Sequence, residues 1–415
     1  MPLPSLTEIK NRRDFADAFN IAMAGADQSL HSIWQQFGKD QNLPKSYLIE
    51  FHPKDNIHSE ADWTAEDLFS TLTKNGDRIG VTVRRTDDES LLYLSHNERA
   101  HSAEFIVDAL NPRFLAFHTL SNAKETDRFM LGRLSQYQRE FDCFWLPVSV
   151  LESVEQREQV TGWEASFEPL LDGVQFRSER EDSDDEEIDS RFPELLEALD
   201  DEVPVSIPHH TSLRINILRR NAMKAYGELR QARILPDIPL SSILAERFDN
   251  ELCTQARARI KWNGKVTGRG TDFLSYLQIV NGTLDNYAGI VTSLESQYWL
   301  GLDHAEQEPS TGFRLKGEPF CIKFESDINV ESVMVGMFNC RPPFRLMGEP
   351  EKLSDNYYVV DAVDLHVGQP LAIEISPRLI RIYLYNGTCG NTIARILRSL
   401  QHYIDSNLSH PTLQS

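Results

Sequence analysis

The sequence lacks long apolar runs, which excludes a membrane protein built from membrane-spanning helices. No stretch of its 415 residues approaches the roughly 18 consecutive apolar residues that a membrane-spanning helix needs. The N-terminal stretch "MPLPSLTEIKNRRDF" also has no apolar segment followed by a cleavage site, as a secretory signal would. We therefore expect a cytoplasmic protein with no membrane among its partners.

Paired cysteines are also lacking. The chain has five cysteines in all, and none forms a Cys-x-x-Cys pair of the kind that chelates zinc or acts as a redox dithiol. Free cysteine is among the most buried residue types, so we expect reduced, buried thiols and no disulfide framework. These residues are Cys143, Cys253, Cys321, Cys340 and Cys389.

Cations are scarce, and acidic residues concentrate in one segment. Lysine and arginine number 42 against 63 acidic residues, a net charge of -21, and residues 178–202 contain thirteen acids and only two arginines. Such a block of like charge repels itself and stays solvated. Because a chain of this length exceeds the usual size of one hydrophobic core, we expect two domains. They would be residues 1–177 and 205–415, joined by an acidic flexible linker at 178–204.

Helical and strand patterns are mixed along both predicted domains. Helical spacing is found at about 6–37 and 272–302, whereas 80–120 and 319–385 hold strand-like runs separated by turn residues. A last helix is predicted from about 391 to 404, after the glycine turn "NGTCG". Regular βαβ alternation is missing, so the predicted fold class is α+β.

Residues 204–270 are basic, with twelve cations against five acids. Within them "RARIKWNGKVTGRG" predicts a β-hairpin, because Asn263-Gly264 is a strong signal for a two-residue turn. Side chains alternate between the two faces of a strand, so we expect the cations to share one face. Trp262 at the tip would offer a ring for base stacking. The predicted contacts with nucleic acid or another polyanion are Arg257, Arg259, Lys261, Trp262, Lys265 and Arg269.

The predicted C-terminal helix adds a second group of cations. Apolar residues fall on one side of this helix, and Arg395, Arg398 and His402 cluster on the other. They complete the predicted polyanion contacts. The simpler alternatives are a solvated edge strand for the hairpin, whose cations block edge pairing, and a solvated face for the helix.

Motifs for catalysis or cofactor binding are missing from the sequence. "LYNGTCGNT" lies between a predicted strand and helix but lacks the lysine spacing of a phosphate loop. "HNERAHSAE" lacks the His-Glu-x-x-His spacing of a zinc helix. "FHPKDNIHSEAD" has His52 and Lys54 in the His-x-Lys order of phospholipase-D-like enzymes, but Ser59 stands where the aspartate is required. We therefore expect no cofactor and no metal, and the sequence favours a protein that is not an enzyme.

Four stretches carry a resemblance: "NPRFLAFHTL", "FDCFWLPVSVLE", "KWNGKVTGRGTDF" and "PRLIRIYLYNGTCGNTIARIL". Together they resemble uncharacterised accessory proteins of prokaryotic antiviral defence systems. The resemblance implies a biological setting and transfers no catalytic residue.

The sequence thus predicts a non-catalytic component of a multi-protein prokaryotic assembly, with antiviral defence as its setting. It would contact DNA, RNA or another protein subunit through the C-terminal domain. One alternative is a metal-dependent nuclease with dispersed catalytic residues. Another is an interaction protein that is autoinhibited when its acidic linker occupies the basic segment.

Overall fold

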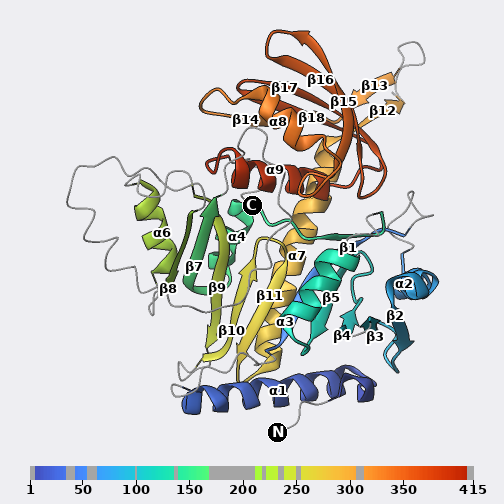
Figure 1. The fold of residues 1–415 in the computed structure, drawn as a ribbon, viewed down its shortest axis with the longest axis vertical. Coiled ribbons are helices and arrows are strands. Elements are labelled where there is room, and N and C mark those ends of the chain that lie inside the picture. The colour runs from blue at the N-terminus through green and yellow to red at the C-terminus, as the bar shows by residue number, and fades with distance from the viewer. Residues whose placement is uncertain are drawn as a thin grey trace.

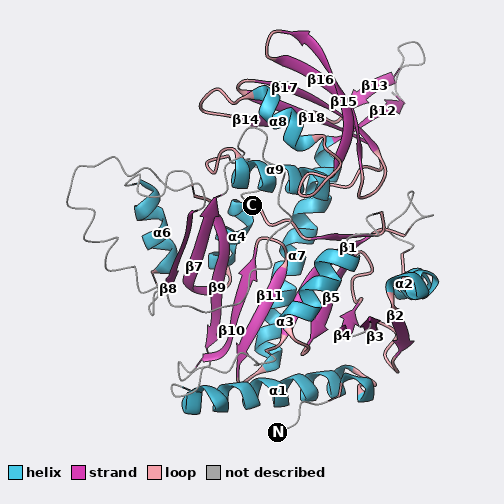
Figure 2. Cartoon of the chain, in the orientation of Figure 1, coloured by secondary structure: helices cyan, strands magenta, loops and turns pink. Residues whose placement is uncertain are grey.

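The computed structural model describes residues 5–33, 43–53, 63–98, 101–134, 139–167, 211–216, 221–231, 238–248, 254–304 and 313–408. The predicted acidic linker at 178–204 lies outside these residues. In the described part of the chain, helices pack on two sheets whose strands are mostly antiparallel, which confirms the α+β class (Figures 1 and 2).

An eleven-stranded sheet forms the lower part of the described structure in Figure 1. Its order is β2-β3-β4-β5-β1-β11-β10-β9-β7-β8, with β6 pairing β1, and neighbouring strands in this order run antiparallel. The strands are β1 (Lys45–Phe51), β2 (Val81–Arg85), β3 (Leu91–Glu98), β4 (His101–Asp108), β5 (Phe114–Thr119), β6 (Phe141–Cys143), β7 (Gln159–Phe167), β8 (Thr211–Asn216), β9 (Leu240–Phe248), β10 (Thr254–Lys261) and β11 (Lys265–Gly270).

Strands from both sides of residues 178–204 belong to this one sheet. Strand β1 pairs β11, with Lys45 opposite Thr267, and β7 pairs both β8 and β9. The predicted boundary at 178–204 therefore does not separate two sheets. Local sequence patterns do not reveal which distant strands pair, because the partner of a strand is selected by its whole hydrophobic face.

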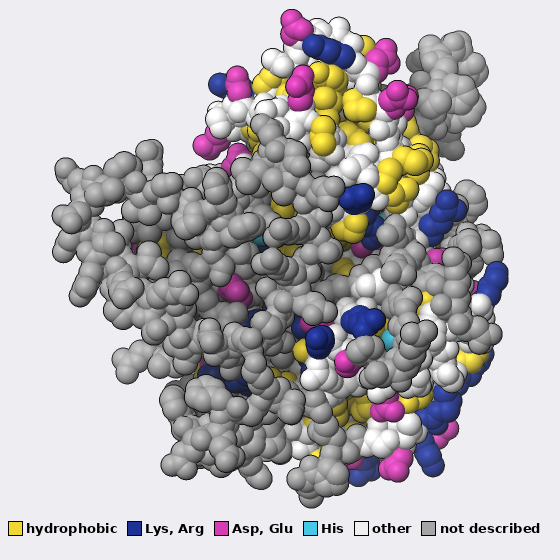
Figure 3. All heavy atoms as spheres, viewed as in Figure 1, with side chains coloured by type: hydrophobic (Ala, Val, Ile, Leu, Met, Phe, Trp, Pro, Cys, Tyr) yellow, Lys and Arg dark blue, Asp and Glu magenta, His cyan; other side chains and the backbone are white. Residues whose placement is uncertain are grey.

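A seven-stranded sheet forms the upper part in Figure 1, in the order β13-β12-β18-β17-β16-β15 with β14 pairing β18. In the space-filling view, hydrophobic side chains reach the surface over this sheet (Figure 3). Its strands are β12 (Trp299–His304), β13 (Phe313–Lys316), β14 (Phe320–Lys323), β15 (Leu346–Ser354), β16 (Tyr357–Asp364), β17 (Pro370–Ser376) and β18 (Leu379–Tyr385).

Helix α7 links the two sheets and is the longest element of the described chain. It spans Phe273–Tyr298, as the apolar spacing at 272–302 predicts. Its N-cap is Asp272, whose carboxylate accepts from the amides of Leu274 and Ser275. Buried residues of β1, β10, α7 and β18, such as Leu48, Ile260 and Ile382, belong to one hydrophobic cluster, so the core runs through both sheets.

The other helices cover the sheets or fill the space between them. In Figure 1, α1 lies across the lower end of the large sheet and α9 lies between the two sheets. No helix in the described ranges is both long enough and apolar enough to cross a bilayer. The helices are α1 (Arg12–Ile33), α2 (Ala65–Ile79), α3 (Ala123–Asp127), α4 (Val148–Glu152), α6 (Ala222–Gln231), α8 (Val330–Met337) and α9 (Asn391–Tyr403), with short helical turns at Leu6–Glu8, Arg128–Arg133 and Ser153–Gln156.

Candidate functional site

The predicted basic hairpin is present as β10 and β11. Gly264 has a φ of 76° and donates its amide to the Lys261 carbonyl, so Trp262 and Asn263 are the central residues of the turn. The hairpin is confirmed, but its tip is a three-residue loop in which only Gly264 has a positive φ, and the predicted two-residue Asn263-Gly264 turn is wrong. The alternation along β10 is also confirmed. Arg257, Arg259 and Lys261 are half-buried on one face, whereas the residues between them lie in the core.

Neither strand of the hairpin is an edge strand, so the alternative of a solvated edge is wrong. β11 pairs β1 and β10 pairs β9, which places both near the middle of the sheet. Arg257 forms an ion pair with Glu246 on β9. Lys265 is buried at 4% exposure, with Nζ 2.7 Å from Asp127 Oδ2. Arg269 lies directly opposite Arg257 and is half-buried.

Trp262 at the hairpin tip points into the protein. Its ring centroid lies 5.2 Å from that of Trp145 and 6.2 Å from that of His402, and the Arg398 guanidinium carbon lies 5.4 Å from it. A Cβ on Gly264 would approach Phe144 Cβ to 2.8 Å. The tip is thus inserted among core residues, which opposes the predicted role of Trp262 as an exposed stacking platform.

Helix α9 is buried on nearly all sides, so the expectation of a solvent-facing cationic stripe is wrong. Arg395 and Arg398 have 0% and 1% exposure. Burial lowers the pKa of Arg398 to about 9 and that of His402 to about 3. The helical wheel identified the two faces of α9 correctly, but it could not show that the polar face packs against β9 and the first sheet, where Arg398 donates to the Leu240 carbonyl.

Arg395 is the centre of a buried ionic cluster. Its guanidinium lies 2.6 Å from Asp142 on β6 and 2.5 Å from Asp364 at the end of β16. Arg345 forms a second contact with Asp142 at 2.7 Å. Burial alone would raise the pKa of both aspartates, but the adjacent guanidinium groups hold each pKa below its usual value. Both carboxylates are therefore ionised inside the protein.

A second ionic group adjoins the first and joins β1 to α7. Arg113 Nε donates to Glu50 Oε1 at 2.7 Å, and Arg113 NH1 donates to Glu295 Oε2 at 2.9 Å. Glu295 also accepts the backbone amide of Gly390 at 2.8 Å. Burial favours the neutral form of Glu50, but the Arg113 charge and His52 hold its pKa well below the usual value.

Four side chains with metal-binding atoms meet beside Glu50. Glu50 is joined by His52 just after β1, His366 between β16 and β17, and Cys389 before α9, and one ligating atom of each lies within 4.8 Å of the others. Cys389 Sγ is 3.2 Å from both oxygens of Glu50, and His52 Nε2 is 3.1 Å from Oε1. We call these four residues the ligand cluster. All but His52 are fully buried, with 0–1% exposure.

The electrostatic environment decides the protonation of this cluster. Burial lowers the pKa of His366 to about 4, so its imidazole is neutral at pH 7. Burial, with the adjacent Glu50 charge, raises the pKa of the Cys389 thiol well above its usual value. An activated cysteine nucleophile needs the opposite shift. The protein without a bound cation therefore holds Cys389 as a thiol that donates to Glu50.

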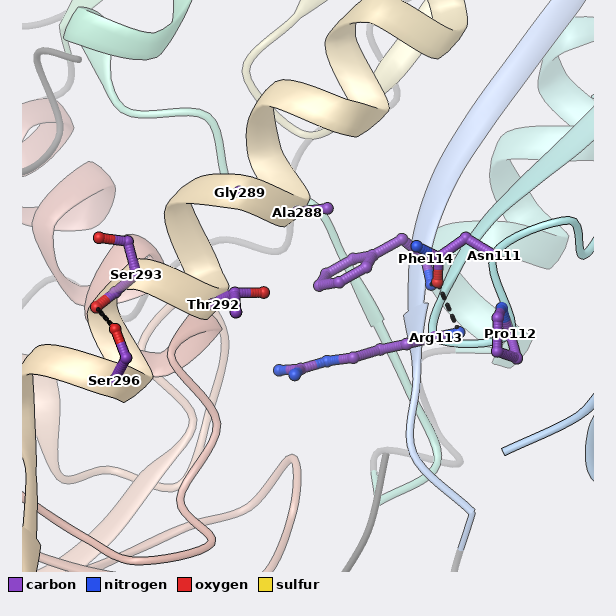
Figure 4. Close-up of a pocket in the computed structure, with 9 residues that line it drawn as sticks. All are labelled: Asn111, Pro112, Arg113, Phe114, Ala288, Gly289, Thr292, Ser293 and Ser296. Carbon is purple, nitrogen blue, oxygen red and sulfur yellow. Dashed lines mark hydrogen bonds between the residues drawn. The ribbon is translucent and has the colours of Figure 1, made fainter. Parts of the chain in front are cut away.

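A cleft of about 730 Å³ borders the second ionic group. Its walls come from the segment before β5 and from α7, and Figure 4 shows Arg113 extending towards α7. Arg113 therefore belongs both to the cleft lining and to the ion pairs with Glu50 and Glu295. The lining includes Asn111, Arg113, Phe114, Thr292, Ser293 and Ser296.

Sequence reasoning missed the ligand cluster because its members are far apart in the chain. Metal motifs are recognised by short spacings, whereas 339 positions separate Glu50 from Cys389. The sequence did contain one signal for this region. Three of the four stretches that carry the resemblance contain residues of the buried ionic groups or the ligand cluster. The first contains Arg113, the second Asp142, and the last both Cys389 and Arg395. "NGTCGNT" brings Gly390 against α7, where a Cβ would approach the Val291 carbonyl oxygen to 2.6 Å.

Comparison with known proteins shows similarity over most of the chain. The chain is 24% identical over 377 residues to "Uncharacterized protein MJECL33" of Methanocaldococcus jannaschii, covering 88% of this chain and 86% of the relative. No solved structure matches. The MJECL33-like protein family matches residues 4–412, which include both sheets, the hairpin and the ligand cluster. The chain therefore belongs to the MJECL33-like protein family.

Proposed function

We propose that this protein is a non-catalytic component of a multi-protein prokaryotic assembly and that the face of β10 and β11 bearing Arg257 contacts nucleic acid. We call this surface the cationic face; its half-buried members are Arg257, Arg259, Lys261 and Arg269. The observation that carries the proposal is their placement on one face of two paired strands. Proteins gain most of their nonspecific affinity for nucleic acid from such groups of cations.

The direct pairing of Arg257 with Arg269 supports a polyanionic ligand. Like charges directly opposite each other in a sheet are destabilising, and Glu246 offsets part of that repulsion through its ion pair with Arg257. A phosphate backbone lying along the face would offset more of it. The side chain of Arg257 is 41% exposed, so its guanidinium is accessible to a ligand.

The buried state of the ligand cluster supports a non-catalytic role. Glu50, His366 and Cys389 are inaccessible to a large substrate, and the protonated thiol is a poor nucleophile. The setting in antiviral defence remains a hypothesis that rests on the resemblance of the four sequence stretches.

A protein partner has a separate candidate surface on the second sheet. Met347 and Leu353 lie on β15, the last strand in the order of that sheet, with 49% and 56% exposure. Exposed apolar side chains on a terminal strand are a feature of surfaces that bind other proteins.

The test measures binding of the full chain to labelled single-stranded DNA, duplex DNA and RNA across a salt titration. Replacing Arg257, Arg259 and Lys261 by Gln should weaken binding to every sequence alike. It should also reduce the magnitude of the slope of log affinity against log salt concentration by about two to three, if each cation neutralises one phosphate. The control variant replaces Arg13, Arg85 and Lys352 by Gln, which changes the net charge equally at exposed positions away from the cationic face.

The results distinguish whether the ligand is nucleic acid and whether it binds at the cationic face. Equal binding by the two triple variants would reject the cationic face as the contact surface. An absence of binding to all three nucleic acids at low salt would reject nucleic acid as the ligand and leave only a protein partner.

A metal-dependent nuclease is the second candidate, favoured by the convergence of the ligand cluster from distant segments. Such an enzyme would degrade DNA or RNA only with a divalent cation, and Glu50→Gln would abolish the activity. Degradation that persists in Glu50→Gln, or that needs no metal, would reject this candidate.

A further inference from the structure

We propose that Glu50, His52, His366 and Cys389 bind one zinc ion, which ties strand β1 of the first sheet to the C-terminal part of the chain. This site goes beyond the proposed function, because zinc binding is measurable whether or not the protein binds nucleic acid. The ligand types are the first argument. Imidazole nitrogen, thiolate sulfur and carboxylate oxygen are the atoms that bind zinc in proteins, and a set containing sulfur disfavours magnesium and calcium.

The distances are the second argument. In a tetrahedral zinc site with bonds of about 2.0–2.3 Å, neighbouring ligand atoms are about 3.3–3.8 Å apart. Cys389 Sγ is 3.2 Å from the Glu50 oxygens and His52 Nε2 is 3.1 Å from Oε1, close to that spacing. The largest separation in the cluster is no more than 4.8 Å, so small side-chain rotations bring all four atoms to one ion.

The charge of the surroundings is the third argument. The two adjoining ionic groups contain four carboxylates, from Glu50, Asp142, Glu295 and Asp364, and three guanidinium groups, from Arg113, Arg345 and Arg395. Among these seven side chains the carboxylates outnumber the guanidinium groups by one, and a buried carboxylate is stabilised by a partner of opposite charge. A divalent cation bound at Glu50 would supply that charge and would displace the thiol proton of Cys389.

The supporting residues hold the cluster in place from outside. Arg113 contacts Glu50 Oε1, and Glu295 binds the amide of Gly390 next to Cys389. The imidazole rings of His52 and His366 pack edge to face, with their centroids 5.1 Å apart. Metal ligands are usually oriented by such hydrogen-bonded neighbours. Four protein ligands with almost no solvent access are typical of a structural zinc site, in contrast to a catalytic one that keeps an open position.

The first test measures the metal content of the full chain after purification without chelators. We expect about one zinc per chain by inductively coupled plasma mass spectrometry. Folded wild-type protein that carries no zinc, and that takes up none when dialysed against zinc chloride, would overturn the proposal.

The second test uses variants with a matched control. Cys389→Ser should lose the bound zinc or weaken its affinity by at least about tenfold to a hundredfold, and Cys321→Ser, at a half-buried thiol outside the cluster, should keep it. Circular dichroism and gel filtration verify that both variants fold. Retention of stoichiometric zinc by folded Cys389→Ser would reject the site.

Cobalt substitution keeps the proposal testable if Cys389→Ser does not fold. Cobalt in place of zinc in the wild-type protein should give an absorption band from thiolate-to-cobalt charge transfer, and this band should also appear in Cys321→Ser. A cobalt-loaded protein without this band has no thiolate ligand, which would contradict the proposed ligand set.

Discussion

Cys389 Sγ lies 3.2 Å from each carboxylate oxygen of Glu50, although 339 positions separate the two residues. Glu50 belongs to a central strand of the first sheet, and Cys389 precedes the helix that lies between the two sheets. Their contact shows that the beginning and the end of the described chain share one buried polar region. The stability of that region depends on complete pairing of its charges.

The first prediction concerns Arg395. Replacing it by Met should lower the free energy of unfolding by about 3–5 kcal/mol, because Asp142 and Asp364 would lose a partner inside the protein. Urea unfolding followed by circular dichroism measures the change. Arg378→Gln is the control, since it breaks an ion pair that is 67–68% exposed and should cost less than about 1 kcal/mol. Equal effects of the two substitutions would contradict the ionic cluster.

The second prediction concerns Gly264 at the hairpin tip. Gly264→Ala should destabilise the protein by about 1–3 kcal/mol, because φ is 76° and the new Cβ would approach Phe144 Cβ to 2.8 Å. Gly282→Ala within α7 meets no atom within 4 Å and should instead stabilise the helix by about 0.5–1 kcal/mol. Thermal unfolding of both variants measures these opposite signs. A neutral Gly264→Ala would mean that the tip is not inserted in the core.

The third prediction concerns the stability of the protein in acid. Burial lowers the pKa of His118 to about 4, from 6.5 in an exposed chain. Between those values the unfolded chain takes up a proton that the folded protein does not. The stability contributed by neutral His118 is thus present above pH 6.5 and is lost progressively as the pH falls to 4.

His118→Asn tests this pH dependence and retains a polar group near Ser46, which contacts His118 Nδ1 at 2.8 Å. The variant should reduce the slope of unfolding free energy against pH by up to about 1.4 kcal/mol per pH unit in that window. Urea titrations at a series of pH values measure the slope. An unchanged slope would show that His118 binds protons equally in the folded and unfolded states, which would contradict the lowered pKa.

The fourth prediction concerns the acidic segment, which lies outside the described residues. If it occupies the cationic face, deletion of residues 179–202 should raise the affinity for nucleic acid at matched salt, because an internal competitor is removed. Fluorescence anisotropy measures the change. A deletion variant that also carries the Arg257, Arg259 and Lys261 to Gln substitutions should gain nothing. Unchanged affinity on deletion alone would remove the autoinhibition hypothesis.

Short-range patterns were sufficient for several elements of the fold. Asn263-Gly264 indicated the hairpin, although only Gly264 adopts a positive φ and the turn is centred on Trp262 and Asn263. The apolar spacing after Asp272 determined α7, and alternation along β10 determined which side chains share a face. Each of these depends on backbone and side-chain preferences within about one turn or one strand pair.

The environment of those elements was decided only by the tertiary structure. The sequence determined that Arg395 and Arg398 share one face of α9, but packing between the sheets decided that this face is buried. In the same way, the sequence showed Cys389 and His52 only as residues outside any metal-binding motif. The folded chain brings both of them to Glu50. Charge burial and ligand convergence depend on contacts between distant segments, and these form only when the hydrophobic faces of both sheets have selected their partners.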